Sequence, residues 1–108
     1  MIIIIEEDLF YSHNDEERFY AALEDNPGIK SIRAFHQGKG RRTGVELRID
    51  PKRMTPDALR DLLALMWRYE CPLPPLRVFA DTKKHAWLKN KEMYWFKPMF
   101  RGARRKRR

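Results

Sequence analysis

The apolar residues of the chain change clearly from alternating to helical spacing near residue 50, and this change limits the folds that the chain can adopt. Over Gly44–Asp50 every second residue is apolar, namely Val45, Leu47 and Ile49, which predicts a strand with one buried face. Directly afterwards the spacing becomes helical, with Leu59, Leu62, Leu63 and Met66 on one side. The two patterns predict an α+β fold in which a helix packs on a sheet.

Residues before this point supply two further strands and a helix. Ile2–Glu6 is continuous and β-branched, so we expect a strand that is buried on both faces in the centre of the sheet, with Ile4 in the core. A helix over residues 14–25 is expected to end at Asn26-Pro27-Gly28. Ile29–His36 is expected to form a hairpin with Gly44–Asp50 through the basic link 37–42.

Residues after 55 complete the predicted order. Thr55-Pro56-Asp57 is typical of a helix start, and the proline-rich segment from Cys71 ends that helix. Leu76–Ala80 is predicted as a fourth strand, followed by a short helix from Asp81 or Thr82 through Lys89. Tyr94-Trp95-Phe96, closed by Pro98, forms either an edge strand or an aromatic strap.

The resulting order is β-α-β-β-α-β, the ferredoxin-like pattern of an antiparallel sheet with helices on one face. A C-terminal helix and aromatic extension follow it. We therefore expect a single α+β domain over residues 1–100 and a basic tail over residues 101–108.

Charge is distributed very unevenly along the chain. Residues 1–82 hold 12 Lys+Arg and 14 Asp+Glu, whereas residues 83–108 hold 11 basic residues and a single acid, Glu92. The tail alone carries six cations: Arg101, Arg104, Arg105, Lys106, Arg107 and Arg108. Guanidinium groups suit phosphate contacts, so the tail predicts binding to a polyanion. A solubilising or targeting terminus is the alternative interpretation.

Cations and aromatic rings also alternate before the tail. Lys83, Lys84, Lys89 and Lys91 surround Trp87 and Trp95, with Tyr94 beside them. A single-stranded nucleic-acid platform needs this combination, because cations neutralise phosphates and rings stack on bases. The alternative is that the rings belong to the core, which a chain of this length needs, and that the lysines are simply solvated.

Side chains that carry catalysis or bind metal are sparse. Cys71 is the single cysteine, and His13, His36 and His85 are too far apart for ligand spacing. The acidic run Glu6-Glu7-Asp8 at a strand end is a weak pointer to Mg²⁺, and solvated loop charges are more common there. We therefore predict no enzyme activity, no cofactor and no metal.

These patterns favour a nonenzymatic nucleic-acid-associated protein, with RNA preferred as the partner. The alternative is a small protein-binding inhibitor or adaptor, of the toxin-immunity or phage-inhibitor type, that acts on an acidic protein surface. The N-terminal apolar run is too short for a signal peptide or a membrane span, and a lone cysteine fits a reducing compartment. A cytoplasmic location without membrane contact is therefore expected.

Overall fold

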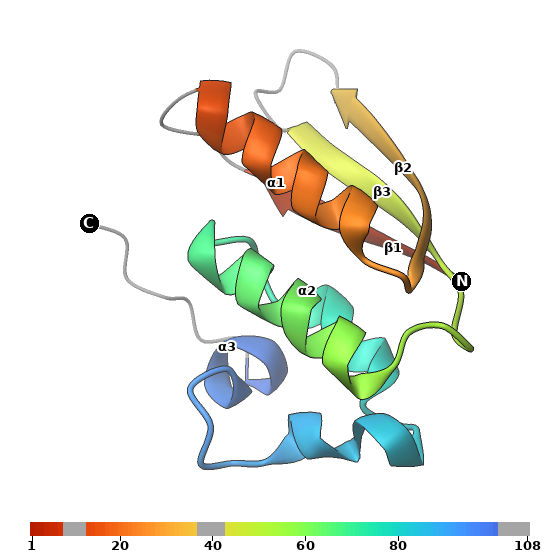
Figure 1. Cartoon of the computed structure of the whole chain (residues 1–108). Helices are drawn as coiled ribbons and strands as arrows, with labels where there is room; N and C mark the ends of the chain where they lie inside the picture. Colours follow the sequence, from red (N-terminus) through yellow and green to blue (C-terminus); the bar gives the residue numbers. More distant parts are fainter. Residues whose placement is uncertain (8–12, 37–42, 102–108) are drawn as a thin grey trace.

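The structure is a computed structural model, and it describes residues 1–7, 13–36 and 43–101. Its sheet contains three antiparallel strands in the order β1-β3-β2. The strands are β1 (Ile2–Glu7), β2 (Ile29–His36) and β3 (Thr43–Ile49). Helices α1 (His13–Asp25) and α2 (Pro56–Arg68) run antiparallel to each other on one side of the sheet (Figure 1). The predicted α+β class is confirmed.

The alternating pattern of β3 sets the buried face of the sheet. Leu47 lies opposite Ile3 of β1 and Ile32 of β2, and Val45 lies opposite Ile5. Val45, Leu47, Ile3 and Ile5 are all buried. Side chains directly opposite each other in an antiparallel pair share one face. The inward residues of β3 therefore pack between those of its two neighbours and under the helices.

Strand β1 is an edge strand, so the prediction of a central strand buried on both faces is wrong. Among the described residues β1 pairs with β3 alone. Ile2 and Ile4 are 52% and 48% exposed, whereas Ile3 and Ile5 are buried. The helices cover a single face of the sheet, and the even-numbered isoleucines point away from it.

The hairpin of β2 and β3 is confirmed, with pairs from Ile29↔Ile49 to His36↔Thr43. Its link, residues 37–42, lies outside the described residues. Asn26, at the predicted helix stop, joins α1 to α2 by donating from Nδ2 to the Ala58 carbonyl at 2.8 Å. Its Oδ1 accepts from the Gly28 amide at 2.9 Å, which fixes the turn into β2.

Helix α2 begins as the sequence predicts. The Thr55 side chain accepts a hydrogen bond from the Ala58 amide, and Pro56 occupies the first helical position, where a missing N–H costs nothing. The predicted stripe of Leu59, Leu62, Leu63 and Met66 is buried, and Ala58 is buried beside it. The helix ends at Arg68, and Glu70 turns the chain with a φ of 59°.

The segment predicted as a fourth strand, Leu76–Ala80, is a 3₁₀ helix instead. This helix, η1, spans Pro74–Phe79. Two consecutive prolines start it, fixing φ near the helical value and removing two backbone donors that a sheet ladder would need. Leu76 and Phe79, three positions apart, are both buried, which suits three residues per turn. The second β-α-β unit therefore stays incomplete.

The C-terminal extension folds back along α2. It contains the 3₁₀ helix η2 (Lys83–Lys89), where a short helix is predicted, and the short helix α3 (Phe96–Phe100). Thr82 does not cap η2, because its hydroxyl donates to the Phe79 carbonyl at 2.9 Å. Tyr94 and Trp95 lie in a turn before α3, so the edge-strand alternative for this segment is wrong. Figure 1 places η2 and α3 on the side of α2 that faces away from α1.

Candidate nucleic-acid interface

Four aromatic rings from α2 and the extension form a continuous row, called here the aromatic cluster. The order is Trp67, Tyr94, Trp95 and Trp87, with ring centroids 4.5, 5.1 and 5.6 Å apart in edge-to-face contacts. Each such contact stabilises the fold by more than the burial of the ring surfaces alone would. The cluster fixes the turn at residues 91–95 against α2, and it brings together rings that are 28 positions apart in the chain.

The two tryptophans that the sequence pattern nominates are held inside this packing. Trp95 is 8% exposed, and its Nε1–H donates to the Leu88 carbonyl at 2.9 Å. Trp87 is half-buried and lies under the Arg60 guanidinium, 4.7 Å from the ring centroid. Its Nε1 is buried and has no hydrogen-bond partner among the described residues. Both rings therefore have structural neighbours where a stacked base would lie.

Tyr94 is the ring of the cluster that faces solvent. It is 50% exposed, and the neighbouring Met93 is 37% exposed. Trp67 and Trp95 contact the Tyr94 ring from two sides and hold it in place. The sequence analysis places Tyr94 beside the two tryptophans that it expects to stack on bases. It could not single out Tyr94, because the exposure of a ring depends on long-range packing that residue spacing does not reveal.

The cations of the extension are exposed, but they differ in whether they already have a partner within the protein. Lys84 donates to the Pro51 carbonyl at 2.8 Å, and Lys89 lies 3.6 Å from the Asp81 carboxylate. Lys83 and Lys91 are exposed and form no ion pair within the described part of the chain. Arg101 lies over the Phe96 ring at 5.8 Å from its centroid. Five further predicted residues, Arg104, Arg105, Lys106, Arg107 and Arg108, lie outside the described residues.

Arg60 is a residue of this surface that the sequence pattern misses. It lies on the exposed side of α2, seven positions before Trp67, and it also pairs with Asp57 at 3.2 Å. The signal that could have found it is helical spacing, because positions 60, 64 and 67 share one face of a helix. This face borders the extension, because Arg60 lies over the Trp87 ring and Trp67 contacts the Tyr94 ring.

His85 is a buried structural residue next to the cluster. Desolvation by burial lowers the pKa of His85, and the nearby Lys84 charge lowers it further, while a backbone hydrogen bond with Met54 opposes both. Its ring packs edge-on against Phe79 at 5.7 Å. Cys71 is also buried. Over residues 1–7, 13–36 and 43–101 there is no group of three acidic, histidine or cysteine side chains that could hold a metal ion.

Comparison of the chain with profiles of known protein families, with curated proteins and with solved structures finds no significant match. No helix within the described ranges has the length and apolar character needed to cross a membrane. The fold and the surface chemistry therefore carry the functional argument.

Proposed function

We propose that this chain is a nonenzymatic nucleic-acid-associated protein that contacts single-stranded RNA through its C-terminal third. The single observation that carries the proposal is an exposed tyrosine, Tyr94, which is seated on two other rings and has the exposed Lys91 and Lys97 three residues to either side in the sequence. An aromatic face held rigidly beside positive charge suits stacking on a base while phosphates are neutralised.

The roles within this surface follow from exposure. Tyr94 stacks on a base, and Trp67 and Trp95 support it from below. Lys83, Lys91 and Arg101 are exposed and contact phosphates, and the tail residues 104–108 extend the track. Three other predicted residues contribute less directly because each already has a partner in the protein. Arg60 lies over the Trp87 ring, Lys84 donates to the Pro51 carbonyl, and Lys89 pairs with Asp81.

We also infer that the sheet is an incomplete ferredoxin-like arrangement. The order β1-β3-β2 is that of a βαββαβ sandwich without its fourth strand, and η1 lies beside β1, where that strand would run. The outward residues of β1 are the aliphatic Ile2 and Ile4, which cannot stack on bases as aromatic rings do, so the proposed platform is the C-terminal third and not the sheet face. A cytoplasmic location accompanies the proposal, because the single cysteine is a buried free thiol.

A protein-binding inhibitor or adaptor is the second candidate. The exposed Tyr94 and Met93 favour it, since an aromatic residue beside a methionine is typical of the centre of a protein interface. Such an interface would meet an acidic partner surface through the same lysines.

The test is the affinity of the full chain for a labelled single-stranded RNA at about 50 mM salt, measured by fluorescence anisotropy. Tyr94→Ala should weaken binding by about 1–3 kcal/mol, and Tyr94→Phe should retain it because the ring remains. Val78→Ala is the matched control, since Val78 is an exposed apolar residue outside the aromatic cluster.

Absence of measurable affinity for any RNA or DNA would reject the proposal. A single stoichiometric protein partner whose binding requires Tyr94 would put the inhibitor or adaptor function in its place.

A further inference from the structure

One face of the sheet is left uncovered by the helices of the described part of the chain. Helices α1 and α2 lie together on the other face (Figure 1). On β1 the uncovered face carries Ile2 and Ile4, which are 52% and 48% exposed. A sheet face that meets water normally carries polar side chains, and neighbouring exposed aliphatic residues mark interaction surfaces. The uncovered face is therefore a candidate interface.

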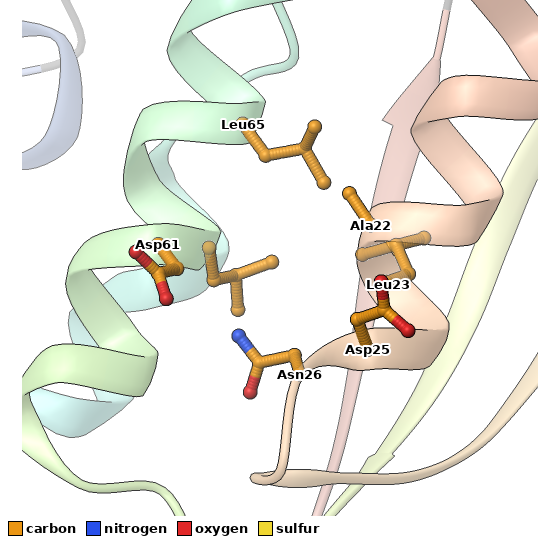
Figure 2. A pocket seen from close by; sticks show the side chains of 7 residues that line it. Ala22, Leu23, Asp25, Asn26, Asp61 and Leu65 are labelled. Atoms are coloured by element: carbon orange, nitrogen blue, oxygen red, sulfur yellow. The ribbon is translucent and has the colours of Figure 1, made fainter.

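The helix layer offers no comparable surface. Figure 2 shows the cleft between α1 and α2, whose apolar lining includes Leu62 and Leu65. Its buried polar side chain, Asn26, already donates to the Ala58 carbonyl and accepts from the Gly28 amide. That side chain needs no further partner, so the search for a partner turns to the sheet.

The strand register arranges the uncovered face in two rows. Residues directly opposite each other in neighbouring antiparallel strands point to the same face. Each row has an isoleucine on β1, a charged residue on β3 and a polar residue on β2: Ile2, Arg48 and Ser31 in the first row, and Ile4, Glu46 and Arg33 in the second. The charge on β3 therefore changes sign from one row to the next.

The charged residues of these rows have no ionic partner within the described residues. Arg48 is exposed and Glu46 is half-buried, and neither forms an ion pair there. Arg33, opposite Glu46, is exposed and also forms none. A cation and an anion in successive rows are therefore available for contact with another molecule.

A second copy of the chain matches this pattern about one two-fold axis. The axis lies between two stacked sheets, runs across the strands, and passes between the two rows. Strand β1 then lies over β1 of the second copy, and each row lies over the other row. Ile2 faces Ile4 of the second copy, and Arg48 faces Glu46 of the second copy. Because the same patch is used on both sides, each of these contacts occurs twice.

Other two-fold axes bring like charges together. An axis along the strands places each row over itself, so Arg48 faces Arg48 and Glu46 faces Glu46. An axis across the strands that passes through one row has the same effect on the charge of that row. Like charges that face each other select against an interface. The charge pattern therefore favours a single arrangement of the two copies.

We propose that the uncovered face of the sheet packs against the same face of a second copy, in a two-fold symmetric dimer. The two sheets lie inside and the helices outside. Stacked sheets are about 10 Å apart, with the side chains of their inner faces interdigitated. The aromatic cluster lies on α2 and the extension, so it takes no part in this interface. The dimer is therefore independent of the proposed function.

The dimer is expected to be weak. Stable interfaces use roughly 20–30 residues from each partner, which is more than one face of three short strands supplies. Sedimentation velocity of the full chain should show monomer at about 1 μM and mainly dimer at about 1 mM.

Charge reversal tests the contact between Arg48 and Glu46. Glu46→Arg and Arg48→Glu each place like charges opposite each other, so each variant alone should stay monomeric where the wild type is dimeric. A mixture of the two variants restores opposite charges at both contacts and should dimerise again. Recovery on mixing separates a contact between copies from a loss of fold, because mixing does not repair a misfolded chain.

Two further substitutions complete the design. Glu24→Arg is the matched control, because it makes the same change in net charge as Glu46→Arg at an exposed position of α1. It should dimerise like the wild type. Ile4→Ser removes an aliphatic contact twice per dimer and should raise the dissociation constant of the dimer at least about tenfold. Met93→Ser, at an exposed apolar position outside the sheet, should leave that constant unchanged.

Three results would overturn the dimer: a wild-type chain that is monomeric at about 1 mM, a dimer that neither Glu46→Arg nor Ile4→Ser weakens, or a mixture of the two charge variants that stays monomeric. The second result would place the contact on another surface, such as the edge of β1. Lack of RNA affinity in a chain that still dimerises would reject the proposed function alone.

Discussion

The indole of Trp95 is tied to the backbone of Leu88, donating from Nε1 to the carbonyl oxygen at 2.9 Å. The two residues are seven positions apart in the chain, and the bond closes the loop between η2 and α3. Tyr94 precedes Trp95 directly and points to solvent instead. Adjacent residues of similar chemistry therefore carry different tasks, one structural and one available for binding.

Replacement of Trp95 should affect stability. Trp95→Ala removes a buried ring and its hydrogen bond, so we expect a loss of about 3–5 kcal/mol in the free energy of unfolding. Tyr94→Ala removes a half-exposed ring and should cost about 1 kcal/mol or less. Chemical denaturation of both variants checks this, and equal losses would show that Tyr94 also belongs to the core.

Removal of the tail should change the salt dependence of RNA binding. Deleting residues 101–108 removes six cations. If four of them contact phosphates, the slope of log K against log[salt] should shrink by about 3, at roughly 0.7 per contact for a single strand. Trp95→Phe, which retains every charge, should leave the slope unchanged. Anisotropy titrations at several salt concentrations measure it, and an unaltered slope after deletion would place the phosphate contacts elsewhere.

His85 should make stability depend on pH. Its pKa is lowered in the folded state, chiefly by burial, so the unfolded chain binds a proton more readily. The contribution to stability is complete above the ordinary histidine pKa of about 6.5 and is lost as pH falls from there toward the folded pKa. Urea denaturation between about pH 5 and 8 should show this fall, and His85→Phe should flatten it in that window. An equally steep fall in the variant would assign the effect to other groups.

The two sides of β1 should respond differently to charge. Ile5→Asp or Leu63→Asp places an unpaired carboxylate in the core, at a cost of several kcal/mol, which is on the order of the whole stability of a domain. Ile4→Asp puts the charge on an exposed position and should leave the protein folded. Thermal melts of the three variants decide the matter. If the Ile4 variant also unfolded, Ile4 would have to be buried, as in a central strand of a larger sheet.

The success of sequence reasoning varied with the kind of pattern. Val45, Leu47 and Ile49 alternate with charged residues, so their buried face is readable, and the α2 stripe is equally clear. In Ile2–Ile5 every position is apolar, so the pattern cannot say that Ile4 faces outward. That choice is made by the helices, which cover one face of the sheet.

The fourth strand and the site were less predictable for related reasons. Val78 and its neighbours have the composition of a strand, but Pro74 and Pro75 and the spacing of Leu76 and Phe79 favour a 3₁₀ turn. Tyr94 is exposed only because Trp67 and Trp95 occupy the space behind it, and those contacts join distant parts of the chain.

The aromatic cluster also determines what intrinsic fluorescence reports. All three tryptophans of the chain, Trp67, Trp87 and Trp95, belong to it, whereas the sheet and α1 contain none. Emission therefore senses the seam between α2 and the extension and is blind to the β-hairpin. If the extension detaches before the sheet melts, the fluorescence transition will precede the far-ultraviolet circular dichroism transition. Tryptophan emission therefore reports on α2 and the C-terminal extension alone.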